Sequence, residues 1–138
     1  MKVVIDTNIF VSSFFRGKPK KVIDHWKDGK IVLCLSGEIL EEYVEVLRRL
    51  GLEGEKELAE LLALFGKGFN IQFTRKTPKL SVVSDDPDDD KFIECAVALE
   101  ADYIISGDKA LMNVGRYKKI KILSPREFLK ISRLWPIL

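Results

Sequence analysis

The 138-residue sequence contains only two cysteines and one histidine, and this shortage excludes several kinds of site. A structural zinc site needs about four clustered Cys or His ligands, which these three scattered residues cannot supply. Cys34 and Cys95 both lie inside apolar runs, which is typical of buried free thiols in a reducing compartment, so no disulfide framework is expected. We interpret His25, which lies within a helical pattern, as an ordinary helix residue.

Long apolar runs are also missing, and none approaches the roughly 18 residues that a membrane-spanning helix needs. The chain starts with a short strand-like segment, so no secretory signal is expected. Neither sign of charge dominates, because 23 Lys and Arg oppose 21 Asp and Glu for a formal net charge of +2. We therefore expect one cytoplasmic domain, residues 1–138, with no membrane contact, in which any nucleic-acid binding depends on local clustering of charge.

Short β-rich segments alternate with helical patterns along the chain. The expected strands are Val3–Ile5, Ile31–Leu35, Ile71–Thr74, Tyr103–Ser106 and Ile120–Leu123. The expected helices are Lys20–Lys27, Gly37–Leu50, Lys56–Phe65, Asp88–Glu100 and Pro125–Ile131, with a short turn near Ala110–Asn113. This alternation predicts an α/β fold, a three-layer α/β/α sandwich around a parallel sheet of about five strands.

Two carboxylates follow predicted strands directly: Asp6 after the first and Asp108 after Tyr103–Ser106. Right-handed crossovers bring the carboxyl ends of parallel strands to one edge of the sheet, where ligands bind in such folds. Each residue alone could instead be a helix cap or a turn residue. Together they predict a concentration of negative charge that a cation such as Mg²⁺ would neutralise.

Asp89 lies near the start of a predicted helix, where aspartates also act as caps. A helical step of about 100° places Asp89 within about 80° of the apolar stripe of Phe92, Ile93, Ala96 and Leu99. A carboxylate on the inner face of a helix needs a partner, which favours a functional role. The neighbouring acids Asp86, Asp88 and Asp90 can face water and are explained as helix-start charges.

The helix Gly37–Leu50 carries four glutamates, and its geometry favours Glu42 without excluding Glu41. Glu42 lies about 40° from Val46, just outside the apolar arc, and Glu41 lies on the opposite edge of that arc. A solvated acidic face that pairs with Arg48 and Arg49 explains these residues equally well.

Four motifs occur in order along most of the chain. They are Val4-Ile5-Asp6-Thr7-Asn8, Ser36 through Glu42, Asp89-x-x-Phe92-x-x-x-Ala96, and Tyr103-Ile104-Ile105-Ser106-Gly107-Asp108. The ordered set resembles the PIN-domain ribonucleases, which include the VapC-type toxins of prokaryotic toxin–antitoxin pairs. In that family the second acid falls six residues after the serine, so the resemblance selects Glu42.

The resemblance implies a metal-dependent endoribonuclease that hydrolyses RNA phosphodiester bonds. The quartet Asp6, Glu42, Asp89 and Asp108 would bind Mg²⁺ or Mn²⁺ and carry catalysis, with Asn8 and Ser106 in support. Many relatives have Thr at the position of Ser106 and a further acid at the position of Ala110. Asp85, Asp86 and Asp88 remain open as additional contacts. An antitoxin partner and a homodimer are also implied.

Basic residues are expected to offset the repulsion between such a pocket and RNA phosphates. Four follow the first motif, Arg16, Lys18, Lys20 and Lys21, and further candidates are Arg75, Lys76, Lys79 and the run Arg116–Lys119. Solvated surface charge explains any single one of them at least as well. Phe14 and Phe15 could stack on bases, although core packing explains them better. The alternative function is a catalytically inactive module of the same fold that binds RNA or a protein.

Overall fold

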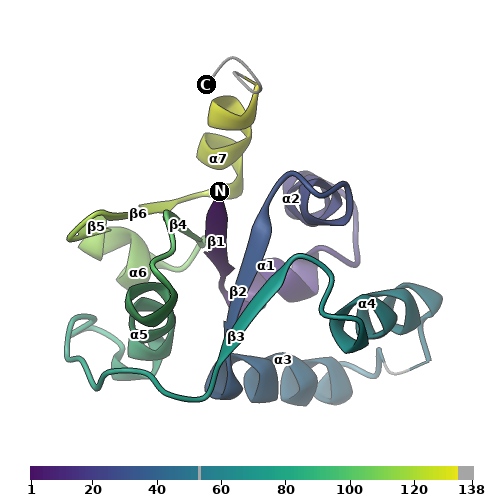
Figure 1. Ribbon diagram of the computed structural model, residues 1–138, viewed down its shortest axis with the longest axis horizontal. Helices are drawn as coiled ribbons and strands as arrows, with labels where there is room; N and C mark the ends of the chain where they lie inside the picture. The colour runs from purple at the N-terminus through teal and green to yellow at the C-terminus, as the bar shows by residue number, and fades with distance from the viewer. Residues whose placement is uncertain (53, 134–138) are drawn as a thin grey trace.

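The computed structural model describes residues 1–52 and 54–133. Its elements in chain order are β1 (Lys2–Ile5), α1 (Thr7–Ser12), α2 (Lys18–Lys27), β2 (Val32–Ser36), α3 (Gly37–Arg49), α4 (Lys56–Gly66), β3 (Ile71–Thr74), the 3₁₀ helix η1 (Pro87–Asp89), α5 (Asp90–Leu99), β4 (Tyr103–Ile105), α6 (Lys109–Val114), β5 (Arg116–Tyr117), β6 (Ile120–Leu123) and α7 (Pro125–Ser132) (Figure 1). Within these residues no helix has both the length and the apolar character that crossing a bilayer requires.

The strands form one sheet in the order β3-β2-β1-β4-β6-β5. All neighbouring strands are parallel except β5 and β6, which are antiparallel. The predicted α/β fold is confirmed, and the five expected strands correspond to β1, β2, β3, β4 and β6. The sequence analysis missed β5 because two residues are too few to show an alternating pattern.

Helices cover both faces of the sheet. In Figure 1, α5 and α6 lie on one side of the central strands, while α1 and α2 lie on the other. The central strands are accordingly inaccessible to solvent, with 0 % exposure at Val3, Val4 and Ile5 of β1 and at Ile104 and Ile105 of β4. Continuous apolar burial of this kind is what a parallel sheet between two helical layers requires.

The first helix after β1 was not expected from the sequence. Asp6 caps α1, because its side chain accepts a hydrogen bond from the backbone N–H of Ile9 at 2.9 Å. The three consecutive residues Ile9, Phe10 and Val11 are all buried, and the exposed positions are only Asn8 and Ser12, so six residues are too few to give a helical sequence pattern.

The order in which the chain adds strands to the sheet reverses at β1, which creates a switch point at the carboxyl edge. Strand β1 lies between β2, to which the chain next connects, and β4, which follows much later. The edge is tied together by the N–H of Asp6, which donates to the carbonyl of Ile105 at 3.0 Å, and by the N–H of Ser106, which donates to the carbonyl of Leu123 at 2.9 Å. Ligand sites in open α/β sheets form at such a switch point.

Candidate active site

Asp6 and Asp108 are connected through the hydroxyl of Ser106. This hydroxyl donates to Asp6 Oδ2 and accepts a hydrogen bond from the backbone N–H of Asp108 at 2.9 Å. Asp108 also caps α6, accepting from the N–H of Leu111 at 3.2 Å. Burial raises the pKa of Asp6, which is 3 % exposed, although the hydrogen bonds from Ser106 and Ile9 oppose this effect. The loop after β4 therefore positions two carboxylates with one serine.

Asp89 lies at the junction of η1 and α5, and its pKa is the most strongly shifted among the candidate acids. Burial, a hydrogen bond with the carboxyl of Asp108 and the negative charges of Asp108, Asp86 and Asp6 raise its pKa to about 8. Three acids separated widely in sequence thus influence one another at the carboxyl edge. A carboxyl held this far from its ordinary pKa beside other acids is typical of a functional site.

Two buried oxygens at this edge have no hydrogen-bond partner among the described residues: Thr7 Oγ1 and Asp89 Oδ2. Thr7 is 4 % exposed and lies next to Asp6 in sequence. Buried oxygens without partners cost about 1–3 kcal/mol each, so their presence beside repelling carboxylates indicates a place for a cation with its water ligands. The donor chemistry, all oxygen, fits a hard ion such as Mg²⁺ or Mn²⁺.

The acids do not enclose an ion by themselves. Over residues 1–52 and 54–133, no group of three or more His, Cys, Asp or Glu side chains converges closely enough to form a metal cage. This geometry is compatible with Mg²⁺, which commonly uses one or two carboxylates and keeps several waters. The residues therefore fit a partly hydrated cation better than a closed structural metal site.

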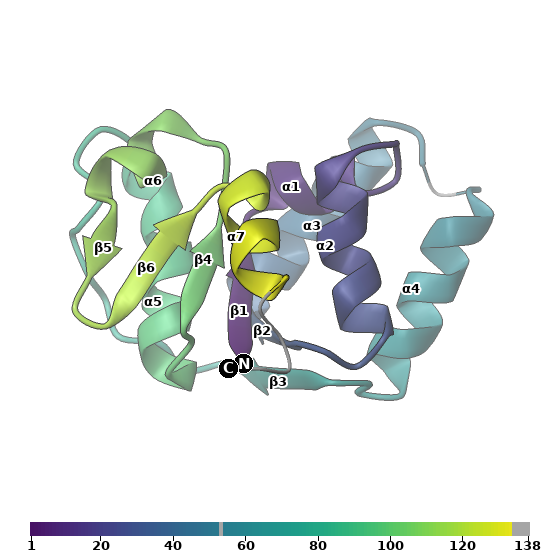
Figure 2. The same cartoon turned by 90° about the horizontal axis from the view of Figure 1, so that it is seen from above.

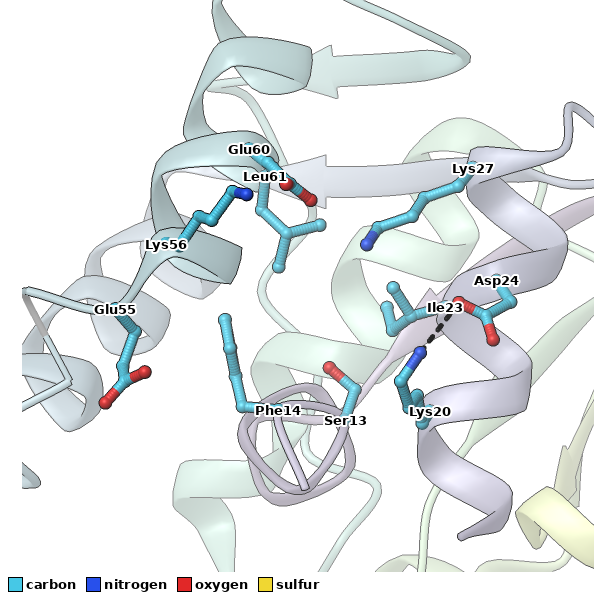
Figure 3. Close-up of a pocket in the computed structure, with 10 residues that line it drawn as sticks. All are labelled: Ser13, Phe14, Lys20, Ile23, Asp24, Lys27, Glu55, Lys56, Glu60 and Leu61. Atoms are coloured by element: carbon cyan, nitrogen blue, oxygen red, sulfur yellow. Dashed lines mark hydrogen bonds and ion pairs between the residues drawn. The ribbon is translucent and has the colours of Figure 1, made fainter. Parts of the chain in front are cut away.

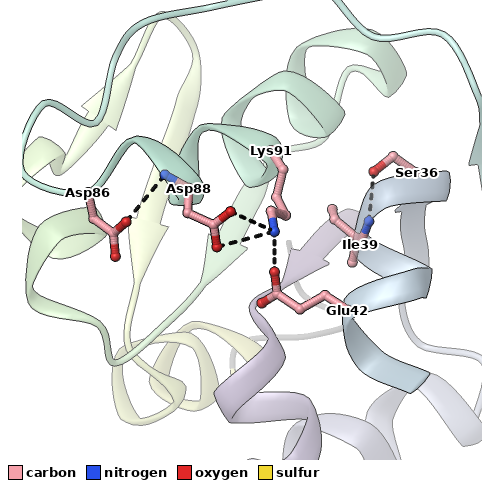
Figure 4. A network of polar contacts seen from close by, with 6 residues as sticks. All are labelled: Ser36, Ile39, Glu42, Asp86, Asp88 and Lys91. Atoms are coloured by element: carbon pink, nitrogen blue, oxygen red, sulfur yellow. Dashed lines mark hydrogen bonds and ion pairs between the residues drawn. The ribbon is translucent and has the colours of Figure 1, made fainter. Parts of the chain in front are cut away.

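Glu42 makes a different contact from the other three predicted acids. Its Oε2 accepts a hydrogen bond from the Lys91 ammonium group, which also lies 3.3 Å from the Asp88 carboxylate (Figure 4). The side chains of Lys91 and Glu42 are 12 % and 24 % exposed, so the pair is largely withdrawn from water. Lys91 thus connects α5 to α3 and donates to one of the two carboxylate oxygens of Glu42.

A cleft of about 450 Å³ opens beside this pair, between α3 and the start of α5. Its lining includes Thr7, Asn8, Glu42, Asp88 and Lys91. Asn8, predicted as a supporting polar group, is exposed here. Glu38, Glu41 and Glu45 also line the cleft, which makes this side of the molecule strongly acidic.

Tyr43 supports the end of β1 through a hydrogen bond to its backbone. It is fully buried, its hydroxyl donates to the carbonyl of Ile5, and its ring stacks on Phe10 with centroids 4.0 Å apart. Burial, followed by the charge of Asp6, raises the pKa of Tyr43 well above its usual range, so the phenol stays protonated and remains a donor. This contact fixes the backbone immediately before Asp6.

Asp90 and Glu94 on α5 hold the irregular segment that precedes the site. Asp90 Oδ1 accepts from the N–H groups of Val82 and Val83 at 3.0 and 2.8 Å, and Glu94 Oε2 accepts from Leu80 N–H at 2.9 Å. The expectation that Asp90 faces water was wrong, because this carboxylate satisfies two backbone donors of a segment that has no strand partner. Glu94, only 8 % exposed, was missed for the same reason.

The predicted RNA-binding residues separate into different places. Lys20 lines a cavity of about 340 Å³ between α2 and α4 and lies 3.5 Å from Asp24 (Figure 3). Arg16 is exposed in the loop between α1 and α2, and Lys18 begins α2 on another side of the molecule. Core packing was the wrong explanation for Phe15, which is 58 % exposed.

Lys91 and Tyr43 are site residues that the sequence analysis missed. Lys91 adjoins the acidic run 85–90, and a lone cation beside five acids is a signal that could have identified it. Tyr43 follows Glu42 directly and lies within the apolar arc of its helix, where an aromatic residue gives no sign of a polar contact.

Comparison with known proteins agrees with this geometry. The model of the PIN domain family matches residues 2–110, a range that contains Asp6, Glu42, Asp89 and Asp108. The uncharacterized protein MJ1680 of Methanocaldococcus jannaschii is 33 % identical over 144 aligned residues, which cover 94 % of this chain and 90 % of that protein.

Proposed function

This chain belongs to the PIN domain family, and from that premise we propose that it is a metal-dependent endoribonuclease that hydrolyses RNA phosphodiester bonds. The observation that carries the proposal is that Ser106 joins Asp6 to the loop of Asp108 at the switch point, beside Asp89, whose pKa is raised to about 8 by burial and then by the charges of Asp108, Asp86 and Asp6. Such mutual repulsion destabilises the fold unless a cation relieves it, so it is best explained by the function of a site.

Each acid has a distinct part in the proposed reaction. Asp6, Asp89 and Asp108 would hold the Mg²⁺ or Mn²⁺, directly or through its waters. The ion would lower the pKa of a bound water and orient it toward the scissile phosphate. Ser106 holds Asp6 and the loop of Asp108 in fixed orientations, and Asn8, which lines the cleft, would contact waters.

Glu42 would orient or deprotonate the attacking water, a role that requires a free carboxylate oxygen. Lys91 binds Oε2, which leaves Oε1 for this task.

Cleavage of a 5′-labelled structured RNA with Mg²⁺ or Mn²⁺ tests the proposal. Wild type should cut only when the cation is present and stop when EDTA is added. Asp89→Asn should lower the rate by at least about 100-fold, while the exposed acid Glu60 on α4, changed to Gln, serves as the matched control. Equal cleavage by Asp89→Asn and wild type would contradict the assignment.

One observation favours the second candidate, an inactive PIN module that binds RNA or a protein. The negative charge of Glu42 is already paired with the ammonium group of Lys91, without a metal ion. Calorimetric titration with Mn²⁺ separates the two functions. The nuclease should bind the ion through Asp6 and Asp89, whereas the inactive module should bind RNA equally well with and without the ion.

A finer proposal is that the protein is the cytoplasmic toxin of a toxin–antitoxin pair and forms a homodimer. Its support is the motif resemblance to VapC-type toxins. Exposed Leu50, at the end of α3, and exposed Leu62, within α4, supply apolar surface for a dimer. Induced expression should arrest growth if the protein is a toxin, and Asp6→Asn should grow normally. Analytical ultracentrifugation tests the dimer.

A further inference from the structure

A strongly basic groove runs between α2 and α7, on a different part of the molecule from the acidic cleft. It has a volume of about 760 Å³. Six cationic side chains line it, against two carboxylates, Asp24 and Asp28. The cations are Lys18, Lys21, Lys30, Arg126, Lys130 and Arg133. The net charge of the whole chain is only +2, so the positive charge is concentrated here.

The walls of the groove are joined, so its shape is fixed. His25 Nε2 on α2 lies 3.0 Å from the hydroxyl oxygen of Ser132 on α7, a hydrogen-bonded contact. The rings of His25 and Phe128 also lie 6.4 Å apart, across the same junction. Two rigid helices thus present cations to a shared opening.

The cations are available to a ligand. All six are exposed, and within the described part of the chain none of them forms an ion pair. If these six cations served only to stabilise the fold, each would lie beside a side chain of opposite charge. Six unpaired like charges along one groove repel one another, and this cost is recovered when a polyanion binds.

The groove leads toward the candidate active site. Strands β1 and β6 are both parallel to β4 and end at the same edge, where Asp6 precedes α1 and Ser124 caps α7. Figure 2 shows that α2 and α7 start at this end of the sheet and run back side by side. Lys18 and Arg126, each in the first turn of its helix, lie at the end of the groove that is nearer to the acids.

An exposed aromatic ring lies on the chain between the site and the groove. Phe15 follows α1, which Asp6 caps, and precedes α2, which begins at Lys18. Its 58 % exposure has no explanation in core packing. Aromatic rings in such positions stack on unpaired bases, at about 1–3 kcal/mol per base.

We propose that the groove between α2 and α7 binds the phosphate backbone of a single-stranded segment of the RNA substrate, with Phe15 stacking on a base between the groove and the acids. The proposal rests on the ribonuclease function but concerns binding alone. The groove follows α2, and the 10 residues of this helix, at about 1.5 Å each, give it a length of about 15 Å. An exposed aromatic on the loop that leads into α2, one wall of the groove, favours a nucleic-acid strand over a flat lipid surface, which has no base to stack.

The test measures binding without cleavage, by the fluorescence anisotropy of a labelled 20-nucleotide single-stranded RNA in EDTA at several salt concentrations. The groove variant is Lys21→Gln, Lys130→Gln, Arg133→Gln. The matched control removes three exposed lysines elsewhere: Lys56→Gln, Lys67→Gln, Lys121→Gln. Circular dichroism and thermal unfolding confirm that both variants are folded, as expected for surface substitutions.

The groove variant should bind at least about tenfold more weakly than wild type, and its salt dependence should flatten by about 2 units of log K against log salt, because three phosphate contacts are lost. The control should match wild type, and Phe15→Ala should weaken binding about tenfold. Equal losses in both triple variants, no RNA binding by wild type, or tighter binding to phosphatidylserine vesicles than to RNA would overturn the proposal. RNA binding without any cleavage would support the groove while contradicting the nuclease function.

Discussion

The ammonium group of Lys91 is bound to the carboxylate of Glu42, although these residues lie 49 positions apart on different helices. The pair brings the start of α5, which carries Asp89, against α3. It also places a positive charge between Glu42 and Asp88, in the lining of the acidic cleft. Lys91 is therefore the closest competitor of a metal ion for Glu42.

Replacement of Lys91 by Met should raise the affinity for Mn²⁺ by about 3- to 10-fold. A local positive charge is removed, and both oxygens of Glu42 become available. Stability in the absence of metal should fall by about 1–2 kcal/mol, between the values for exposed and buried pairs, because Glu42 loses its partner. Calorimetric titration and urea unfolding measure the two effects, with Lys121→Met, an exposed site on β6, as the control. Unchanged Mn²⁺ affinity in Lys91→Met would show that Glu42 has no part in the metal site.

Replacement of Ser106 by Ala should raise the pKa of Asp6 further, because the hydroxyl of Ser106 lowers it in the wild type. The acidic limb of the cleavage profile should move to higher pH, and stability should fall by about 2 kcal/mol with the loss of a buried, charge-assisted hydrogen bond. Ser106→Thr keeps the hydroxyl and should behave as wild type. Carboxyl-carbon NMR titration of Asp6 checks the pKa independently of activity, and no movement in Ser106→Ala would contradict this account.

Local patterns predicted most of the fold and part of the site. The helical spacing from Asp89 correctly predicted that Phe92, Ile93 and Ala96 are buried. Alternation predicted the strands and therefore the edge that Asp6 and Asp108 share. The contacts of Lys91 and Asp90 depend on how distant segments pack, and no local periodicity encodes them. Helix α1 was missed because its buried residues are consecutive rather than periodic.

Replacement of Asp90 by Ala should lower the free energy of unfolding by about 2–3 kcal/mol. Two partly buried backbone donors, from Val82 and Val83, would lose a charged acceptor. Asp88→Ala is the matched control at a neighbouring aspartate, since its exposed contact with Lys91 should contribute less than about 1 kcal/mol. Urea unfolding compares the two variants, and hydrogen exchange should become faster at Leu80, Val82 and Val83 in Asp90→Ala. Similar stability of the two variants would mean that Asp90 does not hold this segment.

The stability of the metal-free protein should decrease as the pH rises from about 4 to about 8. The pKa of Asp89 is raised from an ordinary value of 3.8 to about 8, so between these values the folded protein holds a proton that the unfolded chain has lost. The free energy of unfolding therefore falls with pH across this window, and the raised pKa of Asp6 acts in the same direction. Thermal unfolding in EDTA should give a lower Tm at pH 8 than at pH 5.

Two changes should remove the decrease of the Tm with rising pH, for different reasons. Asp89→Asn carries no charge to repel its neighbours, so its Tm at pH 8 should exceed that of wild type and change less with pH. Millimolar Mg²⁺ should instead raise the wild-type Tm mainly at pH 8, because the ion binds ionised carboxylates of the folded state. An increase of the same size in Asp89→Asn would place the bound ion away from Asp89. A metal-free Tm that rises with pH, and equally in both proteins, would show that Asp89 is already ionised and that its neighbours do not oppose its charge.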